Sequence, residues 1–302
     1  MSSKTRAVAR VLARGVSEPR LALTAIRERG VGYVFDQLVR SSPEKLDDMV
    51  YGLAVRSASE KIESVRRLFG EILSEIADED EGHYRVRLAS GPAFLIRKRA
   101  CMTDMRMIWE TFVREDYRGH PDITGRTVLD VGANLGDTPV YYALRGARVI
   151  AYEPSSELCD LAVRNAAINN LDIEVNNLGI GCEDGILEMA ISPRGATPLS
   201  MTVFPGTVVP RDPRLMRRAQ IRVVPLADVL ARIGPVFLLK MDCEGCEYPA
   251  LLSLSTDQLR SIEHVVVEFH GSADPLRQRL EENGFRVRAG EWKLLLADRC
   301  LQ

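Results

Sequence analysis

The N-terminal part of the chain carries apolar side chains at the spacing of helices. The clearest stretch runs from Ser59 to Ala77, where apolar residues recur every three or four positions with charged residues between them: Ile62, Val65, Phe69, Ile72 and Ile76. This spacing gathers the apolar side chains on one face of a helix. The charged run 78–82 then ends the pattern. We therefore expect a helical N-terminal extension over residues 1–82.

Residues 83–126 show a different pattern, which predicts a hairpin followed by a helix. Apolar and polar residues alternate over 84–88, Ser90-Gly91-Pro92 supplies a turn, and apolar residues return at 94–96. A helix is predicted from Asp104 to Arg114. We interpret this segment as a lead-in to the main domain.

From Thr127 to the C-terminus at residue 302, predicted strands and helices alternate. The strands are expected at 128–131, 149–152, 173–178, 236–241, 265–269, 285–288 and 292–297. Runs that are apolar at consecutive positions, such as 236–239, are typical of parallel strands covered on both faces. The pattern predicts an α/β doubly wound sheet with an antiparallel final strand. Residues 184–225 interrupt the alternation with strand-like pieces at 186–191, 201–204 and 221–224, which we expect to form an insertion over the sheet edge.

Composition narrows the class of protein. With 46% hydrophobic and 27% charged residues, and no apolar run near the roughly 18 residues that span a bilayer, the chain is expected to be globular and without a membrane anchor. The net charge of −2 argues against a nucleic-acid-coating protein. The first thirty residues are locally basic (Lys4, Arg6, Arg10, Arg14, Arg20, Arg27 and Arg29 against Glu18 and Glu28). We interpret this segment as a solvated helix, and the N-terminal helices as a surface through which two copies of the chain could associate.

The six cysteines lack the density of a disulfide scaffold, which indicates a reducing compartment with the cytoplasm as the default location. Cys243 and Cys246 form a single C-x-x-C pair. A zinc site would need two further ligands and a redox site would need a thioredoxin-like setting, and neither is visible in the sequence. No metal site is therefore predicted.

The strongest chemical signal is a glycine loop that joins the strand 128–131 to the next helix. Gly132 and Gly136 allow a sharp turn and a close approach of a ligand, while Asn134 stands where a dinucleotide fingerprint has its second glycine. Asp130 would repel a pyrophosphate but would suit a ligand that carries an ammonium and a sulfonium. The loop therefore favours S-adenosylmethionine over NAD. The alternative is that Asp130 merely pins the loop through hydrogen bonds.

Further candidates for the cofactor site follow the next two strands. Glu153 ends the second strand, twenty-one positions after Gly132, where an acid can accept both hydroxyls of a ribose. Gly179 and Ile180, after the third strand, are expected to lie against an adenine.

Ionisable residues gather where two later strands end, and this is where ligands collect in open α/β sheets. Lys240 and Asp242 share one face of their strand, and Asp242 is the first candidate for an acid/base or substrate-orienting role. His270 could accept a proton from a substrate hydroxyl near neutral pH, or it could be structural. Three acids are expected to face the substrate: Glu244, Glu247 and Glu268. A surface ion-pair cluster is the alternative interpretation.

These motifs resemble the FkbM-type S-adenosylmethionine-dependent methyltransferases. The resemblance rests on "VLDVGANLGDT" at 128–138, "VIAYEP" at 149–154, "LLKMDCEGCEY" at 238–248 and "VVVEFHG" at 265–271, with "REDY" at 114–117 similar to the family's lead-in. It implies the seven-stranded class I methyltransferase sheet and methylation of hydroxyl oxygens on sugars, polyketides or other metabolites. It also implies cofactor contacts at Asp130, Gly132, Asn134, Gly136 and Glu153, and a reaction side lined by Lys240, Asp242, Glu244 and Glu247. Cys243 and Cys246 depart from the small or β-branched residues usual in the family.

The expected function is therefore S-adenosylmethionine-dependent O-methylation of a sugar, lipid, polyketide or other small-molecule or glycan acceptor. Three alternatives stay open: an RNA methyltransferase, a non-catalytic cofactor-binding protein, and an NAD-linked oxidoreductase. The basic N-terminus permits RNA as a substrate, but no asparagine-proline-proline-aromatic motif is present. A magnesium ion at Asp242 and Glu268 is conceivable without support from the sequence. The sequence does not reveal the acceptor.

Overall fold

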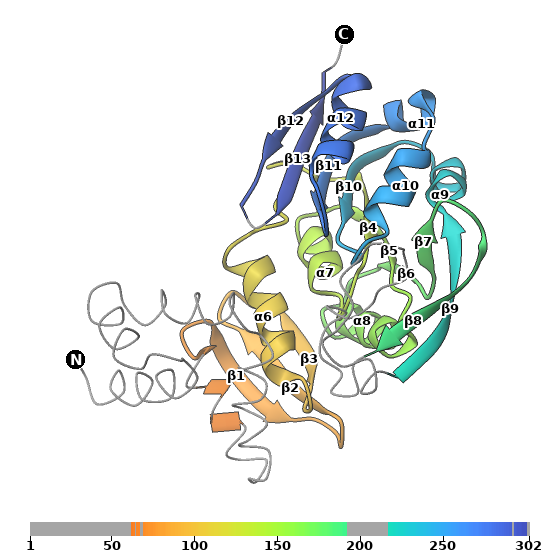
Figure 1. The fold of residues 1–302 in the computed structure, drawn as a ribbon. Helices are drawn as coiled ribbons and strands as arrows, with labels where there is room; N and C mark the ends of the chain where they lie inside the picture. The colour runs from red at the N-terminus through yellow and green to blue at the C-terminus, as the bar shows by residue number, and fades with distance from the viewer. Residues whose placement is uncertain (1–61, 64, 67–68, 192–216, 292, 301–302) are drawn as a thin grey trace, which may run out of the picture. The chain divides into compact units, whose positions relative to one another are not determined.

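The computed structural model describes residues 62–63, 65–66, 69–191, 217–291 and 293–300 (Figure 1). The helices predicted in the first 61 residues, the strand-like piece 201–204 and most of the loop around it lie outside this part of the chain. The chain forms two compact units, 1–107 and 108–302, and each is considered by itself.

The first unit contains an antiparallel sheet in the order β1-β2-β3. Its strands are β1 (Leu73–Asp78), β2 (His83–Leu88) and β3 (Ala93–Arg97), so the predicted hairpin is confirmed. The helix predicted as far as Ala77 is wrong over its last residues, because they form β1. A spacing of four between Ile72 and Ile76 also fits the two-residue period of a strand. Pairing of Ile76 with Val86 of β2 decides the outcome.

Helix α6 (Cys101–Phe112) begins three residues before the predicted start. In its first turn Asp104 is fully buried and accepts hydrogen bonds from the backbone and guanidinium of Arg97, with an Nη2 to Oδ1 distance of 2.5 Å. The boundary between the two units falls within this helix, after Met107.

The second unit is built on a seven-stranded sheet in the order β12-β13-β11-β10-β4-β5-β6. Its strands are β4 (Thr127–Val131), β5 (Arg148–Tyr152), β6 (Glu174–Asn176), β10 (Val236–Met241), β11 (Ile262–Glu268), β12 (Phe285–Ala289) and β13 (Leu294–Arg299). Neighbours from β6 to β11 pair in parallel, whereas β13 is antiparallel to both of its neighbours. The predicted doubly wound sheet with an antiparallel final strand is therefore confirmed.

Helices cover both faces of this sheet (Figure 1). They are α7 (Asp137–Leu144), α8 (Ser156–Ile168), α9 (Leu226–Ile233), α10 (Glu247–Ser253), α11 (Thr256–Arg260) and α12 (Asp274–Glu282). Leu239 packs into the core cluster that contains residues of α9, α10 and α12, while its neighbour Leu238 packs into the cluster that contains residues of α7. Two covered faces explain why β10 and β11 are apolar at consecutive positions.

Two strands of the predicted insertion, β8 and β9, form a small sheet with β7, which precedes the insertion, in the order β7-β9-β8. Its strands are β7 (Gly179–Gly181), β8 (Gly185–Ile191) and β9 (Arg217–Pro225), which confirms the strand-like pieces at 186–191 and 221–224. Among the residues described, no helix is both long enough and apolar enough to cross a membrane.

Candidate active site

The glycine loop turns sharply between β4 and α7, with positive φ angles of 84° at Gly132, 50° at Asn134 and 92° at Gly136. A Cβ on Gly132 would lie 1.8 Å from the carbonyl oxygen of Asp242, and one on Gly136 would lie 2.8 Å from Cα of Ala162 in α8. A larger residue at either position would therefore clash with neighbouring protein backbone. The sequence attributed both glycines to the approach of a ligand, but close packing inside the chain already demands them.

Asp130 lies beneath this loop and is fully buried with Lys240. The Lys240 ammonium lies 3.0 Å from Oδ1 of Asp130 and donates a hydrogen bond of 2.7 Å to the carbonyl of Gly132. Thr138 donates to the other oxygen of Asp130 at 2.5 Å. Burial lowers the pKa of Lys240, but the charges of Asp130 and Asp242 and the hydrogen bond to Asp130 together outweigh it and hold the pKa above its usual value. This geometry fits the alternative in which Asp130 pins the loop, and it places Lys240 in the same role.

Glu153, at the end of β5, is also tied to the loop. Its carboxylate accepts hydrogen bonds from the backbone N–H of Asn134 at 2.9 Å and of Ser155 at 2.8 Å. The carboxylate therefore connects the glycine loop to the turn that follows β5.

An apolar pocket, open to solvent, lies beside the glycine loop. Its lining consists of Val131, Gly132, Tyr152, Pro154, Leu178, Gly179, Ile180, Leu187, Ile221, Val223, Cys243 and Cys246. Of the predicted cofactor contacts, Gly132, Gly179 and Ile180 belong to this lining. An apolar cavity with a few polar groups at its margin is the usual form of a small-molecule site.

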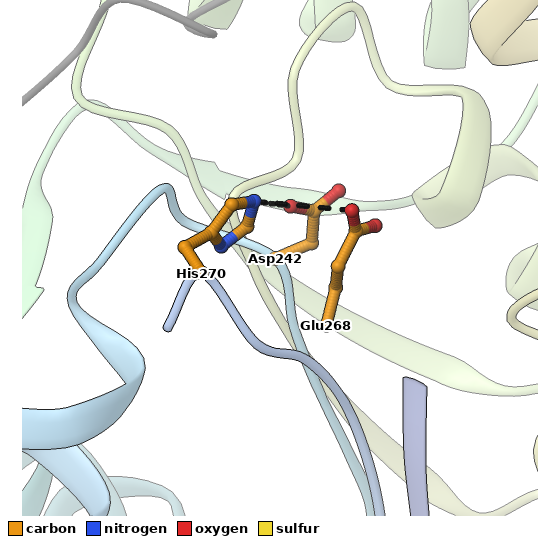
Figure 2. Close-up of side chains that lie close together, drawn as sticks. All are labelled: Asp242, Glu268 and His270. Carbon is orange, nitrogen blue, oxygen red and sulfur yellow. Dashed lines mark ion pairs between the residues drawn. The ribbon is translucent and has the colours of Figure 1, made fainter. Parts of the chain in front are cut away.

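A second group of side chains, from Asp242, Glu268 and His270, converges where β10 and β11 end (Figure 2). The parallel pairing of Met241 with Val267 brings the two strand ends side by side. Nε2 of His270 lies 3.9 Å from Oδ1 of Asp242 and 3.8 Å from Oε1 of Glu268. The structure thus brings together three residues that the sequence separates by up to twenty-eight positions.

Tyr117 joins this group from the loop that follows α6. Its hydroxyl lies 2.9 Å from Oδ2 of Asp242 and 2.7 Å from Oε2 of Glu268, within hydrogen-bond distance of both carboxylates. From the sequence, no role was assigned to Tyr117 beyond the resemblance of "REDY" at 114–117 to the lead-in of the FkbM family. Spacing alone cannot place a loop tyrosine against two strand ends.

His270 is surrounded by carboxylates. Its Nδ1 lies 2.9 Å from Oε1 of Glu247, and its Nε2 lies 3.3 Å from Oε2 of Glu244. Burial lowers the pKa of His270, but the hydrogen bond to Glu247 and the charges of Glu244 and Asp242 raise it more strongly, to about 10. In this arrangement the imidazole is a cation at neutral pH. It can accept a substrate proton only after losing its own.

The two remaining predicted substrate contacts differ in burial. Glu247 is fully buried, and its carboxylate accepts hydrogen bonds from the backbone N–H of Cys243 at 3.0 Å and of Gly245 at 2.8 Å, so it fixes the loop and the imidazole. Glu268 is partly exposed, and burial together with the charge of Asp242 raises its pKa to about 8 against the opposing effects of Tyr117 and His270.

Cys243 and Cys246 form a disulfide within the loop that follows β10. The single C-x-x-C pair, for which the sequence indicated neither a zinc site nor a redox site, is thus disulfide-bonded. The left-handed φ angles of Glu244 and Gly245 fold the loop and place the two Cα atoms 5.5 Å apart, within disulfide range. The C-x-x-C spacing was the available signal. Four cysteines are free thiols: Cys101, Cys159, Cys182 and Cys300.

Comparison with known families decides what this arrangement belongs to. The family model of the methyltransferase FkbM domain matches residues 130–287, more than half of the chain. The chain belongs to the FkbM methyltransferase family. The resemblance drawn from the sequence is thereby confirmed, and with it the class I methyltransferase fold, whose seven-stranded sheet the structure contains.

Curated relatives agree with this assignment of the FkbM methyltransferase. This chain is 27% identical over 199 residues to Methyltransferase 1 of Beauveria bassiana, a match that covers 59% of this chain and 79% of that protein. It is 26% identical over 200 residues to methyltransferase sdnD of Sordaria araneosa, covering 53% of this chain and 73% of that protein. The protein is a methyltransferase.

Solved structures are more distant from the FkbM methyltransferase. Magnesium protoporphyrin IX methyltransferase (ChlM) from Synechocystis PCC 6803 with bound SAH is 11% identical. The match covers 80% of this chain and 95% of that one, with a TM-score of 0.40. The assignment rests on the family match and on the curated relatives.

Proposed function

We propose that this methyltransferase takes its methyl group from S-adenosylmethionine and transfers it to a hydroxyl oxygen of a sugar, lipid, polyketide or other metabolite. One observation carries the proposal: the apolar pocket and the carboxylate cluster share a single loop. Cys243 lines the pocket, and the preceding residue, Asp242, belongs to the cluster. A donor in the pocket and an acceptor at the cluster would therefore meet across Asp242 and Gly132.

The pocket supports the donor half of this proposal. Its apolar walls suit an adenine ring, and we place the methionyl part where Gly132 of the glycine loop lines the pocket. We assign the ribose hydroxyls to Glu153, whose carboxylate follows β5 and contacts the backbone of the glycine loop at Asn134. When bound, S-adenosylmethionine supplies an activated methyl group on a sulfonium. Asp130 and Lys240 hold the loop in place and make no contact with the donor.

The cluster supports the acceptor half. We assign Asp242, which is partly exposed, to binding the acceptor hydroxyl and aligning its oxygen with the methyl carbon. The new O–C bond forms as the C–S bond breaks, the electron pair of that bond stays on sulfur, and the hydroxyl proton passes to the carboxylate cluster. Alignment of the two reacting atoms supplies most of the rate enhancement. Tyr117 and His270 orient the carboxylates that do this.

Calorimetric titration tests the donor assignment. The full chain should bind S-adenosylmethionine and show no heat with NAD, and Glu153→Gln should weaken the binding because an amide accepts fewer hydrogen bonds from a ribose. Thermal unfolding with and without the ligand checks that the variant is folded. Binding of NAD in place of S-adenosylmethionine would overturn the donor assignment.

The acceptor class is tested by incubating the chain and a donor carrying a deuterated methyl group with a metabolite extract. Mass spectrometry and NMR should locate the label on oxygen in a small molecule or glycan. Label on a nitrogen or carbon atom, or label that disappears from the product after ribonuclease treatment, would contradict O-methylation of a metabolite.

A further inference from the structure

The cluster at the ends of β10 and β11 contains a mixed set of nitrogen and oxygen donors. Asp242, Glu268 and His270 each offer one ligand atom, and these atoms lie within 4.8 Å of one another. All three side chains are partly exposed, with the imidazole facing the two carboxylates (Figure 2). An ion could therefore enter from solvent and contact all three.

Tyr117 determines which carboxylate oxygens face the imidazole. Its hydroxyl lies against Oδ2 of Asp242 and Oε2 of Glu268. The other oxygens, Oδ1 of Asp242 and Oε1 of Glu268, are the ones nearest to Nε2 of His270, at 3.9 and 3.8 Å. One free oxygen from each acid and one ring nitrogen are thus turned toward the same point.

Glu247 holds the imidazole from behind. Its fully buried carboxylate lies 2.9 Å from Nδ1, on the opposite side of the ring from the two acids in front. Glu247 is itself fixed by the backbone N–H groups of Cys243 and Gly245. A histidine that binds a metal through one nitrogen usually donates its other N–H to a carboxylate in this way.

We propose that Asp242, Glu268 and His270 bind a divalent transition-metal cation of the Mn²⁺ type. Carboxylates bind hard cations such as Mg²⁺, whereas imidazole binds later first-row metals such as Zn²⁺. A site with two carboxylates and one imidazole therefore fits Mn²⁺ better than either of these ions. Cis ligands about 2.1 Å from an octahedral ion are roughly 3 Å apart. The two edges to Nε2, at 3.9 and 3.8 Å, therefore have to contract by less than about 1 Å, and the edge between the two acids, which is at most 4.8 Å, by up to about 1.8 Å. Rotation about side-chain bonds can supply such movements.

Charge also favours the cation. Four carboxylates, those of Asp242, Glu244, Glu247 and Glu268, lie within 4 Å of the single imidazole. A divalent cation at this point would add two positive charges next to these four carboxylates.

The use of the cation rests on the proposed function. Three protein ligands leave open coordination positions, and a hydroxyl bound at one of them becomes more acidic. The cation would thus bind the acceptor next to the pocket and help it lose its proton. The acceptor would then be a molecule whose hydroxyl oxygen coordinates the cation.

Direct titration of the chelator-treated full chain with Mn²⁺, followed by electron paramagnetic resonance of the free ion, tests the site without donor or acceptor. We expect one bound Mn²⁺ per chain. His270→Gln and Asp242→Asn should each weaken binding at least tenfold. His264→Gln within β11 and Asp257→Asn on α11 are the matched controls, and they should leave the affinity for Mn²⁺ unchanged. Circular dichroism confirms that each variant is folded.

Absence of stoichiometric binding, or equal binding by His270→Gln and the wild type, would overturn the site. Such a chain could still transfer methyl groups to hydroxyls after chelation, which would leave the proposed function intact. Conversely, a chain that binds Mn²⁺ at this site but transfers no methyl group to a hydroxyl would support the metal site and overturn the proposed function.

Discussion

Asp130 in β4 and Asp242 directly after β10 are acids on two neighbouring strands, and their surroundings differ sharply. Asp130 is sealed beneath the glycine loop, with Lys240 and Thr138 taking up its oxygens. Asp242, two residues after Lys240, shares one imidazole with three other acids and is partly exposed. The first acid has a dedicated counter-charge inside the protein, whereas the second belongs to a group with more negative than positive charge. Complete pairing indicates structure, while incomplete pairing beside a pocket indicates a place for a ligand.

The largest effect is expected at the open acid. Asp242→Asn should lower transfer of deuterated methyl groups into the extract by about 10²- to 10⁴-fold, because the carboxylate that binds and deprotonates the acceptor is lost. Calorimetric affinity for S-adenosylmethionine should change little. Asp257→Asn, which removes a carboxylate that is 93% exposed on α11, serves as the control. Equal losses of transfer in the two variants would remove the distinction between Asp242 and an ordinary surface acid.

The sealed acid should respond through stability. Lys240→Met leaves the Asp130 carboxylate buried without its cation, and breaking a buried pair in this way costs about 3–5 kcal/mol. Urea unfolding measures the loss. The double variant Asp130→Asn with Lys240→Met should recover much of it, since no buried charge remains. A single variant as stable as the wild type would show that the pair does not pin the loop.

Asp137 provides a third case, a buried acid at the start of α7. Burial raises its pKa to about 6, with the hydrogen bond from Thr111 opposing. Between about pH 4 and pH 6 the folded protein therefore holds this proton more firmly than the unfolded chain, and stability falls as pH rises through that window. Asp137→Asn should remove a pH-dependent difference on the order of 2–3 kcal/mol.

Unfolding of the wild type and Asp137→Asn at pH 4 and pH 7 measures this effect. The difference in unfolding free energy should favour the variant more at pH 7 than at pH 4. The same difference at both values would place the titration of Asp137 outside this window.

Local patterns predicted the large sheet well because each signal was contained within a few neighbouring residues. Consecutive apolar residues in β10 and β11 revealed strands covered on both faces, and the glycine loop marked the turn into α7. The pattern failed at β1, where spacing fits both a helix and a strand and long-range pairing decides.

The sequence predicted which residues lie at the candidate site, but it did not predict which of them are paired inside the protein and which are open to a ligand. Strand ends identified Asp242, Glu268 and His270, since parallel strands end at one edge of a sheet. Whether an acid is sealed or open depends on partners far away in the sequence. Lys240 lies 110 positions after Asp130, and Tyr117 lies 151 positions before Glu268. For the same reason the sequence left two roles open for His270, a proton acceptor or a structural residue, and did not reveal the disulfide of Cys243.

The smallest effect compares the apolar pocket with its outer surface. Leu187 and Ile186 are neighbours on β8, but Leu187 lines the pocket while Ile186 is 68% exposed. Leu187→Asp places a charge in the apolar wall and should weaken binding of S-adenosylmethionine by about tenfold, or about 1.4 kcal/mol. Ile186→Asp adds the same charge to the same strand outside the pocket and should leave affinity unchanged in calorimetric titration. If the two variants bind equally well, the donor does not occupy this pocket. The difference between Asp130, which is paired below the loop, and Asp242, which is open beside it, would then have to be related to a ligand site elsewhere.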